Sequence, residues 1–292
     1  MAATVEYAAD GLVALLFFLY GARLSPGAVR AGFGKLQLQS AVLLFTFAAY
    51  PLLGLALAGA AAPWLPPALA TGFVFLSCLP STVQSSVGFT GVARGDIAAA
   101  LCAAATSNLL GVLLTPLLAA LLISRAGGGF HPEAALTVAG QLLLPFLLGQ
   151  LARRWLAGWA ERRRGLLQAF DRTVIVPIVY AAFSSSAAGE LRRTLALADL
   201  ALAAGLCVAL FAIALALLWG LARVLQLPAE DRPVLLFCGS HKSLVAGVPL
   251  AAALLPPALA GPALLPIMIF HGLSLLASAI LARRLAAGQG PA

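Results

Sequence analysis

The chain alternates long apolar stretches with short polar or charged connections. Nine apolar segments can be marked, at 9–22, 37–60, 67–92, 97–123, 133–155, 172–188, 196–222, 233–255 and 258–282. Most of them reach the roughly 20 residues that an α-helix needs to cross a bilayer. The pattern predicts an all-α polytopic membrane protein of about nine transmembrane helices, with connections too short to hold a soluble domain.

Two of these segments contain residues that interrupt helices. The third carries Pro80 within "LSCLPSTVQSSVG", and the eighth carries Gly239, Gly247 and Pro249. Transporters built from inverted repeats place paired broken helices near the membrane midplane. The two interrupted segments correspond if the first half lacks its leading span. We therefore divide one integral membrane domain into residues 1–126, with spans one to four, and residues 127–292, with spans five to nine.

The charged residues lie mainly in the connections between the apolar segments, and their distribution predicts the orientation of the chain in the membrane. The chain is 62% hydrophobic and 10% charged with a net charge of +8, and fourteen of its 18 Lys and Arg residues fall on one side of the predicted spans. Arg125, Arg192 and Arg193 fall on the other side, and Lys242 alone lies within a span. This bias predicts an N-terminus outside and a cytoplasmic C-terminus. It assigns the basic excess to the lipid bilayer and not to nucleic acid.

Two further predictions follow from the same residues. The basic run 153–172, with Trp155 and Trp159, is typical of a cytoplasmic interfacial helix. Heavy use of alanine and arginine favours a GC-rich bacterial genome, and so the cell inner membrane.

Polar residues gather beside the interruptions, where backbone at membrane depth must be buried in protein or line a cavity. The candidate substrate- or ion-binding residues are Gln84, Ser85, Ser86, Ser107, Asn108, Ser240, His241, Lys242, Ser243 and His271. Neutral oxygens near Ser86, Ser107 and Asn108 could coordinate sodium. The alternative is that these side chains hydrogen-bond neighbouring helices, at about 0.6 kcal/mol each.

Lys242 requires compensation, because a charge at mid-helix costs about 2.5–3.5 kcal/mol. No Asp or Glu lies deep in any predicted span. Three states remain open: a neutral amine, an ammonium solvated by freed carbonyls, or a counter-charge for an anionic substrate. A structural role is also open, in which the ammonium replaces a bound cation and braces the broken helix. His241 and His271 could assist proton movement or serve in packing.

Enzymatic chemistry is not indicated. The sequence contains no HExxH motif and no aspartate-rich pair, and Cys78, Cys102, Cys207 and Cys238 stand singly. We expect no catalytic residues and no cofactor, with sodium or protons as possible coupling ions.

Several motifs resemble those of the bile acid:sodium symporter family, solute carrier family 10. They are "LPSTVQSSVGFTGVARGD" (79–96), "AATSNLLGVLLTPLL" (104–118), "LLPFLLGQLARRW" (143–155), "FCGSHKSLVAGVPLA" (237–251) and "LPIMIFHGLSLLASAILARR" (265–284). The resemblance is to the bacterial SBF-like branch related to the seventh human member. It implies panel and core domains, two broken helices that cross in the core, alternating access, and a chain that begins at the second of ten spans.

The resemblance does not carry sodium coupling with it. Where the bile-acid branch has a Ser-Asn pair of sodium ligands, this chain has Ser86 and Val87, and polar positions of the next span carry Ala100 and Ala104. The acidic position of the second broken helix falls near Cys238 or Gly239, and its glutamine near Lys242, so an ammonium would occupy about where sodium sits. We predict a secondary active, symporter-like transporter of a small organic anion. The alternative is a regulatory or scaffold protein that keeps the transporter fold without turnover.

Overall fold

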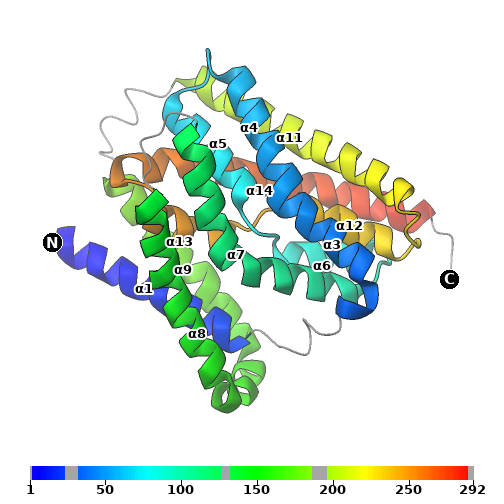
Figure 1. Cartoon of the computed structure of the whole chain (residues 1–292), viewed down its shortest axis with the longest axis horizontal. Helices are drawn as coiled ribbons and strands as arrows, with labels where there is room; N and C mark the ends of the chain where they lie inside the picture. Colours follow the sequence, from blue (N-terminus) through cyan, green and yellow to red (C-terminus); the bar gives the residue numbers. More distant parts are fainter. Residues whose placement is uncertain (1, 24–31, 126–131, 186–195, 289–292) are drawn as a thin grey trace.

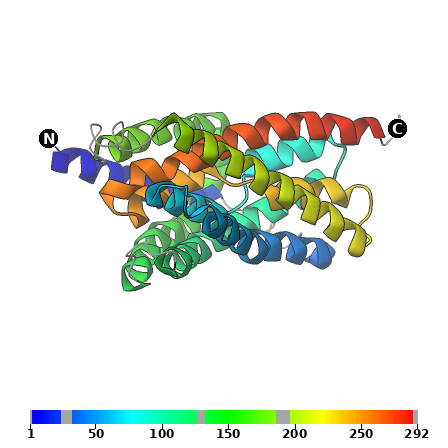
Figure 2. The ribbon, with the colours of Figure 1, turned by 90° about the horizontal axis from the view of Figure 1, so that it is seen from above.

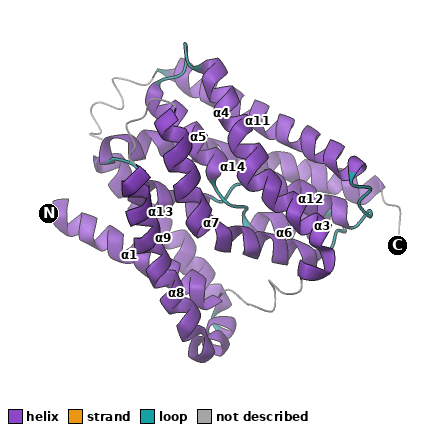
Figure 3. Ribbon diagram, viewed as in Figure 1, coloured by secondary structure: helices purple, strands orange, loops and turns teal. Residues whose placement is uncertain are grey.

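The computed structural model describes residues 2–23, 32–125, 132–185 and 196–288, and every element within them is helical (Figure 3). Figure 1 labels the helices in chain order. Their bounds are α1 Ala2–Arg23, η1 Gly32–Lys35, α3 Leu36–Leu44, η2 Phe45–Ala49, α4 Tyr50–Ala61, α5 Pro67–Cys78, α6 Val83–Val92, α7 Ile97–Arg125, α8 Pro132–Arg162, α9 Arg164–Ser185, α11 Leu197–Val224, α12 Asp231–Ser240, α13 Leu244–Leu254 and α14 Pro257–Gly288.

The helices fall in the nine predicted apolar segments, and several are long enough to cross a bilayer. Five helical stretches in the described residues have the length and composition of membrane spans, or six if the bent pair α5 and α6 is one span. The prediction of an all-α polytopic membrane protein is confirmed. The count of nine spans stays a prediction, as does the inverted repeat. The boundary between residues 126 and 127 lies outside the described residues.

The helices form two groups (Figure 1), and the view from above in Figure 2 shows the elongated outline of the molecule. Helices α1, α8 and α9 pack together, while α7, α13 and α14 of the larger group contact α8 and α9. Gly21 of α1 and Gly149 of α8 permit close backbone contact, because a Cβ on Gly21 would meet the Phe146 carbonyl and one on Gly149 the Phe18 carbonyl. Small residues at such crossings let membrane helices approach closely.

Two membrane-embedded helices are interrupted. The first break, residues 79–82, separates α5 from α6, which are bent by 61°. The second break, residues 241–243, separates α12 from α13. Figure 3 shows both breaks as loop segments in the interior of the bundle.

The expectation for the second interruption was only partly right. Gly239 lies near its start, but Gly247 and Pro249 lie inside α13. Gly247 serves packing, because a Cβ there would lie 2.6 Å from Leu79 Cδ1 of the first break. Ser243 begins α13, since its Oγ accepts a hydrogen bond from the Ala246 amide at 3.1 Å, as N-cap residues do.

The predicted interfacial helix over 153–172 is wrong. Helix α8 continues unbroken to Arg162, and α9 begins at Arg164. The basic run therefore forms the adjoining ends of two long helices, with Trp155 and Trp159 exposed on α8.

Candidate functional site at the two helix breaks

The two breaks touch each other. The Ser243 amide of the second donates a 2.9 Å hydrogen bond to the Pro80 carbonyl of the first. Both breaks are almost entirely buried, as are the ends of α5 and α12 that lead into them. Any polar group released here must find its partner within the protein, because lipid offers none.

The carbonyl groups of residues 77–81, at the first break, each have a hydrogen-bond partner. Residues 77–81 cannot use the regular α-helical pattern, since the chain turns extended after Cys78. Their acceptors are met by Lys242 Nζ at Ser77 and Leu79, Thr115 Oγ1 at Cys78, the Ser243 amide at Pro80, and Asn108 Nδ2 at Ser81. The break is thus held by donors from α7 and from the second break.

Lys242 supplies the only charge in this set of donors. Its side chain is 1% exposed, and Nζ donates to the carbonyls of Ser77 at 2.8 Å, Leu79 at 2.9 Å and Thr46 at 3.0 Å. Nζ also lies 4.1 Å from the centroid of the Tyr50 ring. An ammonium has three N–H donors, and here each faces an acceptor, whereas a neutral amine would turn its lone pair toward a carbonyl oxygen. Of the three states open from sequence, the geometry favours an ammonium solvated by freed carbonyls.

The Thr46 carbonyl is available because of a π-helical turn, η2. The Tyr50 amide bonds to the Phe45 carbonyl, five residues back, and so leaves Thr46 without its usual donor. The residue that would continue the π pattern is Pro51, which has no N–H. The π turn therefore leaves the Thr46 carbonyl free to accept a hydrogen bond from Lys242.

The energies of these contacts exceed the cost of the charge. A mid-helix ammonium costs about 2.5–3.5 kcal/mol on the insertion scale. Each hydrogen bond to a charged group contributes about 1.5–3 kcal/mol, and a desolvated cation over an aromatic face about 2 kcal/mol. Three such bonds and one ring are enough to hold the ammonium without a carboxylate. None of the ion pairs in the described residues includes Lys242.

His241 is fixed beside Lys242 by two hydroxyl groups. Its Nδ1 lies 3.0 Å from Ser85 Oγ of α6 and its Nε2 lies 2.7 Å from Ser278 Oγ of α14. The ring stacks on Phe211 with centroids 6.2 Å apart. The imidazole therefore ties both broken helices to α14.

The residues considered for sodium serve as braces in this structure. Ser86 Oγ donates to the Phe237 carbonyl at 3.1 Å, and Ser107 Oγ accepts from the Ser81 amide at 3.0 Å. Asn108 Nδ2 also donates to the carbonyl of its own helix at Ala104. In the described part of the chain, the group of side chains with metal-ligand spacing lies elsewhere, at Asp96, Glu230 and Asp231.

The remaining candidates differ in access. Gln84 is exposed on α6, and His271 is half-buried on α14 beside the backbone of Lys242. Ser240 Oγ is buried without a partner, while the Ser240 carbonyl accepts from the Tyr50 hydroxyl at 3.1 Å. Of the candidate residues, Gln84, Ser85, Asn108 and His271 are therefore the ones that are not fully buried.

Four contributors were not found from the sequence: Thr46, Tyr50, Thr115 and Ser278. Thr46 contributes its backbone, and its side-chain type carries no signal for that role. Pro51 is the one sequence feature that could have indicated a released carbonyl in this span.

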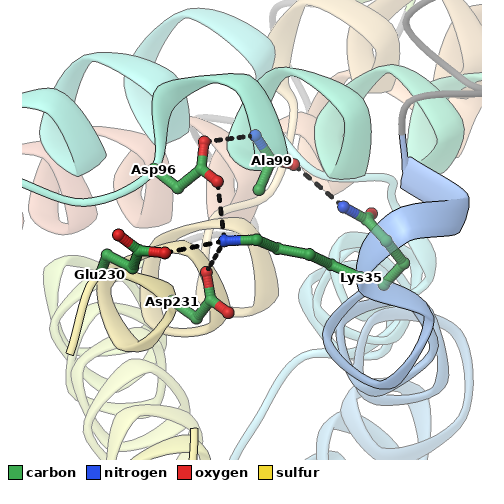
Figure 4. A network of polar contacts seen from close by, with 6 residues as sticks. Lys35, Asp96, Ala99, Glu230 and Asp231 are labelled. Carbon is green, nitrogen blue, oxygen red and sulfur yellow. Dashed lines mark hydrogen bonds and ion pairs between the residues drawn. The ribbon is translucent and has the colours of Figure 1, made fainter. Parts of the chain in front are cut away.

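A second polar cluster lies away from the breaks, where the segments before α3, α7 and α12 meet (Figure 4). Lys35 Nζ lies 2.6 Å from Asp231 Oδ1, 2.8 Å from Asp96 Oδ2 and 3.2 Å from Glu230 Oε1. Hydrogen bonds to Asp231 and then Asp96 raise the pKa of Lys35 above its usual 10.5. The Lys35 bond, followed by the Ala99 amide, lowers the pKa of Asp96 below 3.8. The cluster joins the ends of three helices of the larger group.

Comparison with known proteins identifies the class of this fold. Residues 1–287 match the SBF-like CPA transporter family, so the chain belongs to that family of membrane transporters. It is 44% identical over 287 residues to an uncharacterised protein of Pseudomonas aeruginosa, covering 98% of this chain and 86% of that protein.

Two further relatives carry functional names. YfeH of Escherichia coli, named as a candidate symporter, is 40% identical over 276 residues, covering 93% of this chain and 82% of YfeH. Mouse sodium/bile acid cotransporter 7 is 26% identical over 291 residues, covering 95% and 82%. The resemblance noted from the sequence motifs is confirmed.

Proposed function

We propose that the protein is a secondary active, symporter-like transporter that moves a small organic anion by alternating access. The observation that carries the proposal is the contact between two broken helices around an ammonium that no carboxylate of the described residues neutralises. Family membership supports transport as the general activity.

The electrostatics of the breaks favour an anion. The carbonyls and the Tyr50 ring solvate the Lys242 ammonium but leave its unit charge in place, and a charge in a low-dielectric interior acts over a longer range than in water. Helices α6 and α13 both begin at the breaks, so the positive ends of their dipoles lie there. Gln84, Ser85 and His271 would orient the solute from the accessible side.

The two helix groups suggest how access would alternate. The group α1, α8 and α9 corresponds to the panel of the family, and the remaining helices to the core with its two crossing broken helices. Movement of one group against the other at the contacts of α8 and α9 with α7, α13 and α14 would expose the solute to one face at a time. We place the protein in the cell inner membrane with its N-terminus outside and its C-terminus in the cytoplasm.

The coupling ion remains part of the proposal. The mouse relative is named for sodium and bile acid. In this chain the Ser86 and Ser107 hydroxyl groups near the first break are engaged with the backbone, which supports protons, or no ion, over sodium. His241, bonded on both ring nitrogens, is the residue best placed to hand a proton between α6 and α14.

The test is uptake into proteoliposomes from a mixed organic-anion library under imposed sodium, proton or zero gradients. The matched variant is Ser85→Ala, which removes the half-buried Ser85 hydroxyl of the site and keeps the helix. Accumulation of one anion, reduced in Ser85→Ala, is expected. No accumulation of any library member under any gradient would reject the proposal.

A second candidate, a protein with this fold but no turnover, is favoured by one observation. The carbonyls of residues 77–81 are each already satisfied by the chain itself. Deletion of the protein would then alter another transport system while the purified protein takes up no solute.

A further inference from the structure

The environment of Lys242 Nζ has the composition of a binding site for a free monovalent cation. Three neutral carbonyl oxygens surround one point at 2.8–3.0 Å, and the face of an aromatic ring closes it at 4.1 Å. Backbone carbonyls alone replace the hydration shell of potassium in channel filters, and aromatic faces hold ammonium ions. We infer that Lys242 is a built-in cation, whose ammonium permanently fills a monovalent-cation site formed by the π turn and the first helix break.

The site is assembled from two helices that the lysine does not belong to. The Thr46 carbonyl comes from η2, and the Ser77 and Leu79 carbonyls come from the end of α5 and the first break. The Lys242 side chain reaches them from the second break. We call the Thr46, Ser77 and Leu79 carbonyls and the Tyr50 ring the cage. The cage is built by segments other than the second break, and the Lys242 ammonium fills it.

Satisfying the carbonyls does not by itself require a charge. The neighbouring acceptors of Cys78 and Ser81 are met by neutral donors, Thr115 Oγ1 and Asn108 Nδ2. Within this segment Lys242 serves Ser77 and Leu79, the two residues on either side of Cys78. A neutral side chain could therefore have braced the break, and the positive charge is an additional property of this site.

Covalent attachment makes this cation non-exchangeable. A free ion at such a site could bind and leave during a transport cycle, whereas the ammonium is tethered to the backbone between α12 and α13. Given the transport activity proposed above, this site then supplies the charge that holds the breaks together without coupling uptake to sodium or potassium.

The first test reads thermal unfolding of the full-length protein in detergent and does not depend on transport. Lys242→Ala empties the cage and removes the tether. Its unfolding midpoint is expected to rise by at least about 3 °C in potassium or methylammonium chloride over choline chloride at equal ionic strength. Wild type, with the cage filled, should show no such difference.

The control for this test is Thr115→Val. It also leaves a carbonyl at the first break without a donor, that of Cys78, but it does not remove the ammonium. This variant should unfold earlier than wild type and be indifferent to the cation. Equal responses of Lys242→Ala and Thr115→Val to the added ions would overturn the inference.

A second variant covers the case in which Lys242→Ala does not fold. Lys242→Gln retains two N–H donors but no charge. It should unfold below wild type in every salt, because the cage then holds a neutral group. A wild-type midpoint for Lys242→Gln would show that the charge is unnecessary and overturn the inference.

Uptake measurements separate this inference from the proposed function. Transport by wild type that ignores potassium and sodium, together with cation-dependent stability of Lys242→Ala, supports both. Cation-dependent stability without uptake of any anion supports the built-in cation and rejects the transporter proposal. Uptake of an anion by wild type, with no effect of cations on the stability of Lys242→Ala, supports the transporter proposal and rejects the built-in cation.

Discussion

Thr46 and Lys242 are 196 positions apart in the chain, yet the Lys242 ammonium donates a 3.0 Å hydrogen bond to the Thr46 carbonyl. The bond exists because the π turn withdraws the Tyr50 amide from that carbonyl and Pro51 cannot replace it. A local departure from α-helical geometry in one span is therefore matched to a charge in another. Several consequences can be measured by thermal unfolding in detergent.

The two threonines near the breaks should respond oppositely to the same change. Thr46 uses its backbone carbonyl, and its buried Oγ1 has no partner, so Thr46→Val should leave the free energy of unfolding unchanged or raise it by up to about 1 kcal/mol. Thr115→Val removes the donor to the Cys78 carbonyl and should lower it by about 1–3 kcal/mol. The two unfolding midpoints check this, and a loss at Thr46 equal to that at Thr115 would contradict the assignment.

Tyr50 contributes through two separable contacts. Tyr50→Phe loses the hydroxyl bond to the Ser240 carbonyl and keeps the ring under the ammonium, at a cost of about 1 kcal/mol. Tyr50→Leu also loses the aromatic face and should cost about 2 kcal/mol more. If Phe and Leu destabilise equally, the ring face does not stabilise Lys242. Phe45 and Phe270, which pack edge-on against Tyr50, are left unchanged in both variants.

The contact between α1 and α8 depends on two glycines. Gly21→Ala or Gly149→Ala places a methyl group against the backbone of the opposite helix, and each should lower the free energy of unfolding by about 1–3 kcal/mol. Gly140→Ala is the control on α8, because a Cβ there meets nothing within 4 Å. Gly140→Ala should therefore be neutral or stabilising by up to about 1 kcal/mol, because alanine has the higher helix propensity. Equal destabilisation at all three positions would exclude backbone packing as the cause.

The Lys35 cluster should give stability a defined dependence on pH. The folded-state pKa of Asp96 lies below its usual 3.8, so its contribution is full above pH 3.8 and is lost as the pH falls through the lower folded value. The pKa of Lys35 is raised above 10.5, so its contribution is present below pH 10.5 and is lost as the pH rises through the higher folded value. Both groups stabilise the fold throughout the neutral range.

Lys35→Met tests this directly. Without the ammonium, the Asp96 pKa returns toward its usual value and the three carboxylates repel one another. The unfolding midpoint, followed between roughly pH 3 and pH 7, should fall less on acidification in the variant than in wild type. If the unfolding midpoints of the two proteins fall equally on acidification, the Lys35 cluster is not the cause of the pH dependence of stability.

The sequence allowed much of this architecture to be predicted, and the limits have physical reasons. Apolar length predicted the helices, and Pro80 in an apolar segment predicted the first break with its buried polar residues. The second break lies before Gly247 and Pro249, which both lie inside α13, and Gly247 packs closely against Leu79 of the first break. A glycine or proline in an apolar segment indicates either an interruption or a close contact, and the pattern alone does not separate them.

The partners of Lys242 could not be predicted in the same way. Their acceptors are backbone carbonyls, which every residue carries, so no residue type marks them. What selects these three is local geometry, namely the π turn and the extended chain after Cys78. The sequence predicted an ammonium that needed compensation, and the structure supplies the compensation from segments far away in the chain.

The order of synthesis gives this arrangement a further meaning. Lys242 follows its three acceptors by 163, 165 and 196 residues, so the earlier spans are made long before their donor. Until α12 and α13 are inserted, those carbonyls have no partner, since lipid supplies none. A chain that stops early would leave the first break open at its centre, and such a product should be recognised by membrane proteases. Lys242 thus links an early stage of biosynthesis to a late one, after which only α13 and α14 remain to be added to the described helices.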